Sequence, residues 1–243
     1  MSRNRVLHAH HAPFSSICLL EMYRKSKSGD AVSFVNRSTG FLIADNVLVT
    51  AGHSLSEKDT VIERIEIYPY QNSPQKSERK VRVESTDFVI RKVPEYDNPF
   101  CYVKDDFGII FLKKDKIISP DTFHFDWQPF EPGHTGVKEN DLIRMAGYPI
   151  DKPDFELWEE RGHIVEITSQ CLLHSFTTTK RNSGSPIWAE HNTGMQLVGI
   201  HVSGNAASCH AKPQNRPYGS AVLLTARVVE TIMSWIGEES RKR

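Results

Sequence analysis

Residues 182–188 read Asn-Ser-Gly-Ser-Pro-Ile-Trp, a turn of small polar residues that leads into an apolar strand. Ser183 lies between small neighbours, so a tight turn here leaves its hydroxyl accessible, as a nucleophile requires. Such a turn also aims successive backbone N–H groups at one point, which is how an oxyanion hole is built. The stretch therefore predicts a nucleophilic serine, although its composition is also common in turns with no catalytic role.

Two other stretches supply the groups that a nucleophilic serine needs. Near neutral pH a histidine must accept its proton, and a carboxylate must orient that histidine. His53 ends the buried-strand pattern of residues 47–53, and Asp106 opens the apolar strand pattern of residues 106–112. The order along the chain is His, Asp, Ser, one of the orders in which such a triad occurs.

The rest of the chain predicts an all-β protein. Val and Ile number 18 each against 14 Leu, and β-branched residues favour strands over helices. Thirteen short apolar runs lie between residues 16 and 224, separated by turn residues. This pattern is typical of a barrel or a sandwich. Residues 115–136 are rich in proline and are interpreted as a linker, so each half holds about six strands, enough to close a barrel.

Only the end of the chain predicts a long helix. Apolar residues from Val228 to Ile236 recur at helical spacing, and Gly237 is expected to stop the helix. The predicted organisation is an N-terminal arm over 1–13, a first β-barrel over 14–118, a linker over 119–136, a second β-barrel over 137–225, and a C-terminal helix and tail over 226–243.

The composition excludes several classes of function. Lys+Arg and Asp+Glu are both 30, so the chain lacks the basic excess of a nucleic-acid-binding protein. No apolar run approaches the roughly 20 residues of a membrane span, so no membrane insertion is expected. Neither a P-loop nor a dinucleotide-binding glycine motif occurs, and no cofactor is predicted.

No metal site is predicted either. The cysteines are widely spaced and form no Cys-x-x-Cys pair, which argues against structural zinc; they are Cys18, Cys101, Cys171 and Cys209. We predict four free thiols, with Cys171–Cys209 as the alternative pair. His8, His10 and His11 offer metal ligands, but a flexible polar N-terminus would provide little preorganisation for a metal.

Longer motifs make a family resemblance specific. Residues 146–153 read Ala-Gly-Tyr-Pro-Ile-Asp-Lys-Pro, residues 157–159 read Leu-Trp-Glu, and Gly-His-Ile follows at 162–164. Three threonines precede the serine turn, and Val-Gly-Ile-His follows at 198–201 and Gly-Ser-Ala-Val at 219–222. With the His53 and Asp106 stretches, these motifs resemble trypsin-fold serine proteases, and within that fold the glutamyl endopeptidase (staphylococcal V8-like) branch.

The resemblance implies two perpendicular, six-stranded antiparallel β-barrels with a C-terminal helix and the active site between the barrels. It implies His53 as the base, Asp106 as the acid that orients it, and Ser183 as the nucleophile. The backbone N–H groups of Arg181 and Ser183 would form the oxyanion hole. Asp105 competes with Asp106, but Asp106 directly precedes the apolar strand, as in the family.

The resemblance also implies a specificity for acidic residues. Thr177 stands where trypsin carries the aspartate that binds Lys or Arg, so that anchor is missing. Thr178 and His201 match the threonine and histidine that hold a substrate carboxylate in the V8-like branch, and His201 is expected to be protonated there. Ser203 and Gly204 complete the predicted substrate-binding residues. Alternatively, His201 is a histidine that packs inside the barrel.

Three positions depart from related patterns. Arg181 stands where the family has glycine, and its side chain either turns the peptide away from the oxyanion hole or is accommodated in place. Asn182 replaces the aspartate that captures a new N-terminus in trypsin-type zymogens. Ser54 follows His53, where vertebrate relatives carry a disulfide cysteine. His163 and His174 lie in strand patterns and are interpreted as structural or surface histidines.

The sequence thus predicts a serine endopeptidase that works through an acyl-enzyme and prefers Glu or Asp before the cut. Two alternatives stay open: a catalytically impaired binding or regulatory module with a protease fold, and a processing protease with a narrow recognition sequence. The expected partners are protein or peptide substrates, and a monomer is expected. The resemblance implies secretion, whereas the lack of a signal peptide in the first 30 residues leaves a cytoplasmic location open.

Overall fold

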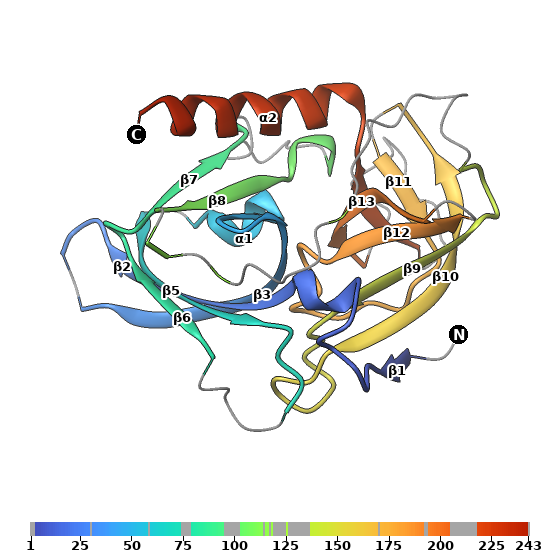
Figure 1. Cartoon of the computed structure of the whole chain (residues 1–243), viewed down its shortest axis with the longest axis horizontal. Helices are drawn as coiled ribbons and strands as arrows, with labels where there is room; N and C mark the ends of the chain where they lie inside the picture. Colours follow the sequence, from blue (N-terminus) through green and yellow to red (C-terminus); the bar gives the residue numbers. More distant parts are fainter. Residues whose placement is uncertain are drawn as a thin grey trace.

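The computed structural model describes residues 3–29, 31–57, 59–73, 79–94, 103–113, 115–116, 118, 125, 137–169, 171–191, 194–204 and 218–242. Two antiparallel β-sheets lie side by side, and one long helix at the C-terminus runs along one edge of the molecule (Figure 1). The first sheet comes from the N-terminal half of the chain and the second almost entirely from the C-terminal half.

The first sheet has the strand order β6-β5-β2-β3-β4-β8-β7. Its strands are β2 (Ile17–Ser26), β3 (Ser33–Ala44), β4 (Val47–Thr50), β5 (Thr60–Pro69), β6 (Val81–Glu84), β7 (Phe88–Lys92) and β8 (Gly108–Leu112). Because side chains alternate along a strand, Leu48 packs inside this sheet while Val47 and Val49 pack against the second sheet. Both faces are covered, which explains why these strands are continuous apolar runs.

The second sheet closes on itself. Its order is β1-β10-β11-β14-β13-β12-β9, and β9 also pairs with β10, so six strands form a closed barrel. The strands are β1 (Arg3–Arg5), β9 (Leu142–Gly147), β10 (Trp158–Ile167), β11 (Cys171–His174), β12 (Pro186–His191), β13 (Gly194–Ser203) and β14 (Gly219–Leu223). The prediction of an all-β, two-barrel fold of the trypsin type with a C-terminal helix is confirmed, with the first sheet as a half-barrel.

The predicted arm does not behave as a flexible segment. The N-terminal half of β10 pairs with β9 on one side, and β11 begins its pairing only at Ile164. The strand β1 fills the edge left between them and pairs with residues 158–160. Val6 and Ala9 are buried next to it, and the N–H of Val6 donates to Leu157 O at 2.9 Å. The expectation of a flexible N-terminus is therefore wrong. The domain boundaries stay a prediction, and the linker over 119–136 lies outside the described residues apart from Phe125.

The three histidines that follow β1 pack against one another. The ring centroids of His10 and His11 are 4.1 Å apart, and His8 stacks on His11 at 5.4 Å. Within the described part of the chain, no group of three or more His, Cys, Asp or Glu side chains is arranged to hold a metal ion. In the same residues, no helix has the length and apolar character needed to cross a membrane.

The C-terminal helix α2 (Ala226–Arg241) is longer than predicted. Thr225 caps its first turn by accepting the N–H of Val228, and Val228, Val229 and Ile232 are buried. Gly237 was expected to end the helix, which instead continues by another turn. Glu239 in that turn is held by Arg91 of β7, and this ion pair stabilises the extra turn.

The prediction of four free thiols is wrong. Cys18 on β2 is free and fully buried, and burial raises the pKa of its thiol far above the ordinary value. Cys171 on β11 is disulfide-bonded, to a partner outside the described residues. Spacing along the chain cannot reveal such a bond, because only the folded chain brings the two sulfurs together. Cys101 and Cys209 both lie outside the described residues.

The turn over residues 181–185 hydrogen-bonds to β3 of the first sheet. The N–H of Thr39 on β3 donates to Ser183 O at 3.0 Å, and the Thr39 hydroxyl donates to Arg181 O at 2.9 Å. Gly184 has a φ of 86°, and a Cβ there would lie 2.1 Å from Thr39 O and 2.2 Å from the Thr50 hydroxyl. Only glycine can occupy this position without moving the two sheets apart.

Replacing Gly184 by alanine should therefore be far more costly than replacing a glycine that only needs its positive φ. Gly29 has a φ of 99°, and a Cβ added there would have open space for 4 Å around it. We expect Gly29→Ala to lower the free energy of unfolding by about 1–2 kcal/mol, and Gly184→Ala by a further 1–3 kcal/mol or so from overpacking. Urea denaturation of the two variants measures the difference. Equal losses would show that the turn does not pack tightly on β3.

Candidate active site

His53 is placed by the short helix α1 (Gly52–Leu55), which starts directly after β4. Its ring Nδ1 lies 2.8 Å from Asp106 Oδ2, and its backbone N–H donates to Asp106 Oδ1 at 2.7 Å. Both oxygens of this buried carboxylate therefore bind one residue. A Cβ on Gly52 would lie 3.2 Å from Asp106 Oδ1, so glycine at this position allows the two segments to approach.

Asp106, and not Asp105, contacts the histidine. Asp105 ends the 3₁₀ turn η3 (Val103–Asp105), and its carboxylate pairs with Arg227 of α2 at 2.9 Å. Asp106 follows this turn immediately before β8 and points to the opposite side. The sequence favours Asp106 because it directly precedes the apolar strand, as in the family; Asp106 does contact His53, and its catalytic role stays a prediction.

Ser183 lies in the second sheet, on the turn that packs on Thr39. Its hydroxyl donates to Val202 O at 3.3 Å. The turn is joined to β13 by two backbone bonds, from Gly184 N to His201 O at 2.8 Å and from His201 N to Ser185 O at 2.9 Å. A bond between the Ser183 hydroxyl and the His53 ring stays a prediction.

The backbone carbonyls around Ser183 are all occupied by donors. Lys180 O accepts the N–H of Ile150 at 3.0 Å, Arg181 O accepts the Thr39 hydroxyl, and Ser183 O accepts the N–H of Thr39. Since the C=O and N–H of a trans peptide point in opposite directions, the bond from Ile150 turns the N–H of Arg181 the other way. No residue that the structure describes accepts a backbone hydrogen bond from the N–H of Arg181 or of Ser183.

Arg181 itself has an unusual backbone conformation. Its φ is 77°, in the left-handed region that side chains disfavour. Its guanidinium binds Asp154 at 2.6 Å. The structure therefore accommodates the side chain where the family has glycine, and the backbone keeps a conformation that glycine adopts freely.

Among the predicted specificity residues, Gly204 lies beside Thr178. A Cβ on Gly204 would be 2.9 Å from the Thr178 hydroxyl, which places the end of β13 beside the segment before the nucleophile turn. The Thr178 hydroxyl is buried and lacks a hydrogen-bond partner among the described residues. His201 on β13 is also buried, and His53 is near enough for its charge to lower the pKa of His201 further. Ser203 follows at the end of the same strand.

His174, interpreted from the sequence as a structural or surface histidine, binds His201. Its Nε2 lies 3.0 Å from His201 Nδ1, and its Nδ1 accepts the N–H of Phe176 at 3.3 Å. An Nδ1 that accepts a hydrogen bond carries no proton, so this contact favours a His174 that donates from Nε2 to His201. The remaining proton of a neutral His201 is then on its Nε2.

Burial keeps both histidines neutral. It lowers the pKa of His174 to about 3, and burial together with the charges of His174 and His53 lowers the pKa of His201 well below 6.5. The expectation of a protonated His201 therefore does not hold for the free protein. In the pairing of β11 with β14, His174 lies opposite Gly219, and a Cβ on Gly219 would lie 2.1 Å from the His174 ring. A glycine opposite the histidine is therefore the feature of the sequence that is linked to this pair. His163 is exposed and takes no part in the pair.

The motifs in the sequence did not indicate the residues that bind the nucleophile turn and support it. Ser38 and Thr39 on β3 bind the nucleophile turn, and Ser38 also donates to the Ser54 hydroxyl at 3.0 Å. A hydrogen bond therefore occupies the position next to His53 where vertebrate relatives carry a disulfide cysteine. Asp154 was missed as well. Small polar residues within a strand are the one feature of the sequence that could have indicated this contact between the two sheets.

Two β-sheets that meet at a His–Asp pair and a serine turn define the class of trypsin-fold serine proteases. A family model described as Trypsin matches residues 22–222, more than half of the sequence, and the chain belongs to the trypsin family. The resemblance to the glutamyl endopeptidase branch is confirmed by the following similarities.

Glutamyl endopeptidases of Staphylococcus aureus strains MW2 and MSSA476 are each 39% identical to this chain over 70 residues. That stretch is 29% of this chain and 20% of each relative, so the match spans about a fifth of the relatives' length. A solved structure of Glu endopeptidase in complex with MPD aligns with a TM-score of 0.70 and 21% identity, over 96% of this chain and 95% of that one. At this identity it supports the shared fold.

The buried histidine pair should make stability depend on pH. In the unfolded chain histidines titrate near pH 6.5, whereas in the folded protein His174 stays neutral down to about pH 3. Between these values the unfolded state binds more protons, so the free energy of unfolding should fall as pH is lowered from about 6.5 to 4.5, by up to about 1.4 kcal/mol per pH unit for each histidine.

Denaturation of His174→Gln over the same pH range should show a shallower slope than wild type. His163→Gln is the control, because His163 is exposed and should leave the slope unchanged. Comparing variants cancels carboxyl groups common to both proteins, such as Glu160, whose pKa burial raises. An unchanged slope in His174→Gln would contradict a histidine that is neutral when folded.

Proposed function

We propose that the protein is a serine endopeptidase that hydrolyses peptide bonds through an acyl-enzyme. Ser183 attacks the carbonyl carbon of the substrate and His53 takes the hydroxyl proton, which it later gives to the leaving amine. Asp106 holds the His53 ring and stabilises its positive charge. The observation that carries the proposal is the pair of hydrogen bonds between Asp106 and His53. The turn that holds Ser183 hydrogen-bonds to Thr39 of the same sheet as His53.

The oxyanion would be bound by the backbone N–H groups of Arg181 and Ser183. The N–H of Arg181 shares its peptide with Lys180 O, which accepts from Ile150, and the N–H of Ser183 shares its peptide with Asn182 O, which accepts the N–H of Ser185 at 2.9 Å. Both N–H groups point away from these bonds and are left for a substrate oxygen. The geometry supports a hole that is formed before substrate binds. It favours the active protease over the impaired binding module that the presence of Arg181 left open.

Ser183 should react with a fluorophosphonate, which requires an activated serine and a working oxyanion hole. Ser183→Ala should abolish labelling and lower kcat for peptide cleavage, on the order of a millionfold for a serine of this role. Ser185→Ala is a matched control in the same turn, because the Ser185 hydroxyl is buried and has no partner in the described part of the chain. Labelling is followed by mass spectrometry. A wild-type protein that is folded but unlabelled would support the impaired module instead.

We also propose that the protease prefers Glu, and less strongly Asp, before the cut. The Thr178 hydroxyl, which has no partner among the described residues, and the Nε2–H of His201 would be the two donors of the predicted pocket. A substrate carboxylate accepts from both, whereas an amide has one oxygen to offer. The partial identity to glutamyl endopeptidases supports the same preference. Neutral His201 donates without a net charge, and a bound carboxylate would raise its pKa.

Removing the histidine should change the preference more than the general activity. In His201→Ala, kcat/KM for Glu substrates should fall relative to Phe substrates by roughly 10- to 150-fold, the equivalent of a hydrogen bond to a charged group worth about 1.5–3 kcal/mol. Thr178→Val should show a smaller effect in the same direction, and His163→Ala none. Digestion of a peptide library measures all three. An unchanged ratio would refute the acidic pocket and leave the Ser183 mechanism intact.

A further inference from the structure

The backbone of Arg181 raises a question that the proposed catalytic groups do not answer. A side chain at a φ of 77° is disfavoured, and such a residue persists only where its surroundings hold it in place. The backbone bonds from Ile150 and Thr39 hold the peptides on either side. The guanidinium of Arg181 provides a third point of attachment, through Asp154.

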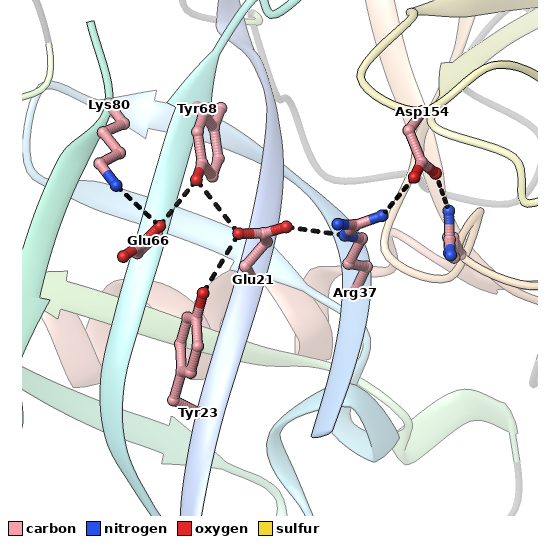
Figure 2. Close-up of polar contacts among 8 residues, drawn as sticks. Glu21, Tyr23, Arg37, Glu66, Tyr68, Lys80 and Asp154 are labelled. Carbon is pink, nitrogen blue, oxygen red and sulfur yellow. Dashed lines mark hydrogen bonds and ion pairs between the residues drawn. The ribbon is translucent and has the colours of Figure 1, made fainter. Parts of the chain in front are cut away.

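A chain of ion pairs leads from Arg181 into the first sheet. Asp154 binds Arg181 with one oxygen at 2.6 Å and Arg37 of β3 with the other at 3.0 Å, and Arg37 Nε binds Glu21 of β2 at 2.7 Å. Figure 2 shows how the chain continues, from Glu21 through the Tyr68 hydroxyl at 3.1 Å to Glu66. These contacts thus connect the nucleophile turn over residues 181–185 with the interior of the first sheet.

The end of this series of ion pairs that lies in the first sheet is held rigidly. Glu66, Glu21 and Arg37 are direct neighbours across three hydrogen-bonded strands, so the sheet itself sets their spacing. The Glu21 side chain is 1% exposed and that of Arg37 15%, and the Arg37 guanidinium lies over the ring of Phe155 at 4.8 Å. Arg181 is 24% and Asp154 49% exposed. The outer residues are therefore anchored to buried ones.

The charges along the chain alternate in sign from Glu21 outwards. Burial raises the pKa of Asp154, but its hydrogen bonds with Arg181 and Arg37 outweigh burial and hold the pKa below its ordinary value. Asp154 therefore stays ionised at neutral pH. A single carboxylate between two guanidinium groups is the link on which the connection to Arg181 depends.

We propose that Asp154 is a positioning residue, which holds Arg181 in the left-handed conformation that directs its backbone N–H to the substrate carbonyl. This inference rests on the proposed serine-protease function. Asp154 touches neither the substrate nor the reacting atoms, and acts only through Arg181. The ion pairs from Glu21 to Arg181 thus replace the conformational freedom that glycine provides at this position in the family.

A double-mutant cycle tests the link between Asp154 and Arg181. Asp154→Asn should lower kcat with little change in KM, because the oxyanion forms only in the transition state. A loss of roughly 10- to 100-fold is expected, less than the roughly 10²–10³-fold cost of losing a donor outright. Arg181→Gly should retain most of the activity, since glycine adopts the positive φ without restraint. Adding Asp154→Asn to Arg181→Gly should then cause no further loss.

Glu190→Gln is the matched control, because Glu190 is 50% exposed and pairs with Arg144 away from the turn. It should leave kcat unchanged. A merely structural role of Asp154 would cost the same with arginine or glycine at position 181, and that result would overturn the proposal, as would a change confined to KM.

A second readout does not depend on activity. Crystal structures of Ser183→Ala with and without Asp154→Asn report the backbone of Arg181 directly. We expect the Asp154→Asn protein to lose the left-handed conformation or to populate a second one. If Arg181 keeps a positive φ with its N–H unmoved, the proposal is wrong. This comparison decides the question even if the wild type fails to cleave any peptide, an outcome that would refute the proposed function by itself.

Discussion

The contact between Thr39 and the turn over residues 181–185 is the constraint on which the site depends. It joins two sheets that also pack through apolar side chains, and apolar packing alone fixes no exact register between them. Hydrogen bonds across this seam are directional, and Gly184 has no Cβ to keep the two backbones apart. His53 follows β4 of the first sheet and Ser183 precedes β12 of the second, so this contact helps to set where the two residues lie relative to each other.

Around the seam, buried ionisable groups are stabilised in two different ways. His174 and His201 are buried against each other and stay neutral, because desolvation lowers their pKa values. Arg37 and Asp154 keep their charges, because each is hydrogen-bonded to an opposite charge, which raises the pKa of Arg37 and lowers that of Asp154. An uncompensated positive charge on this buried pair would be costly in the free protein. The ion pairs that run from Glu21 through Arg37 and Asp154 end at Arg181 of the nucleophile turn.

Arg181 shows how a family pattern can be changed without losing the geometry behind it. A left-handed residue at this position is provided by glycine in the family, and here by an arginine whose side chain is bound by Asp154. Ser38 and Ser54 show a similar exchange, since a hydrogen bond lies where vertebrate relatives carry a disulfide cysteine. In both cases a backbone requirement is met by side chains from another strand, and the replacement depends on residues distant in sequence.

The sequence by itself determined the positions of the strands, because strand patterns depend on neighbouring residues. The two-barrel class and the pairing of His53 with Asp106 were implied by motifs that resemble a known family. All thirteen apolar runs became strands among the described residues. Only the tertiary structure decided the pairing of β1 with β10, the bonded state of Cys171, the extension of α2 past Gly237, and the contacts of His174, Thr39 and Asp154. These features join residues far apart in the chain, and no local pattern records which distant side chain or strand edge folding will place beside another.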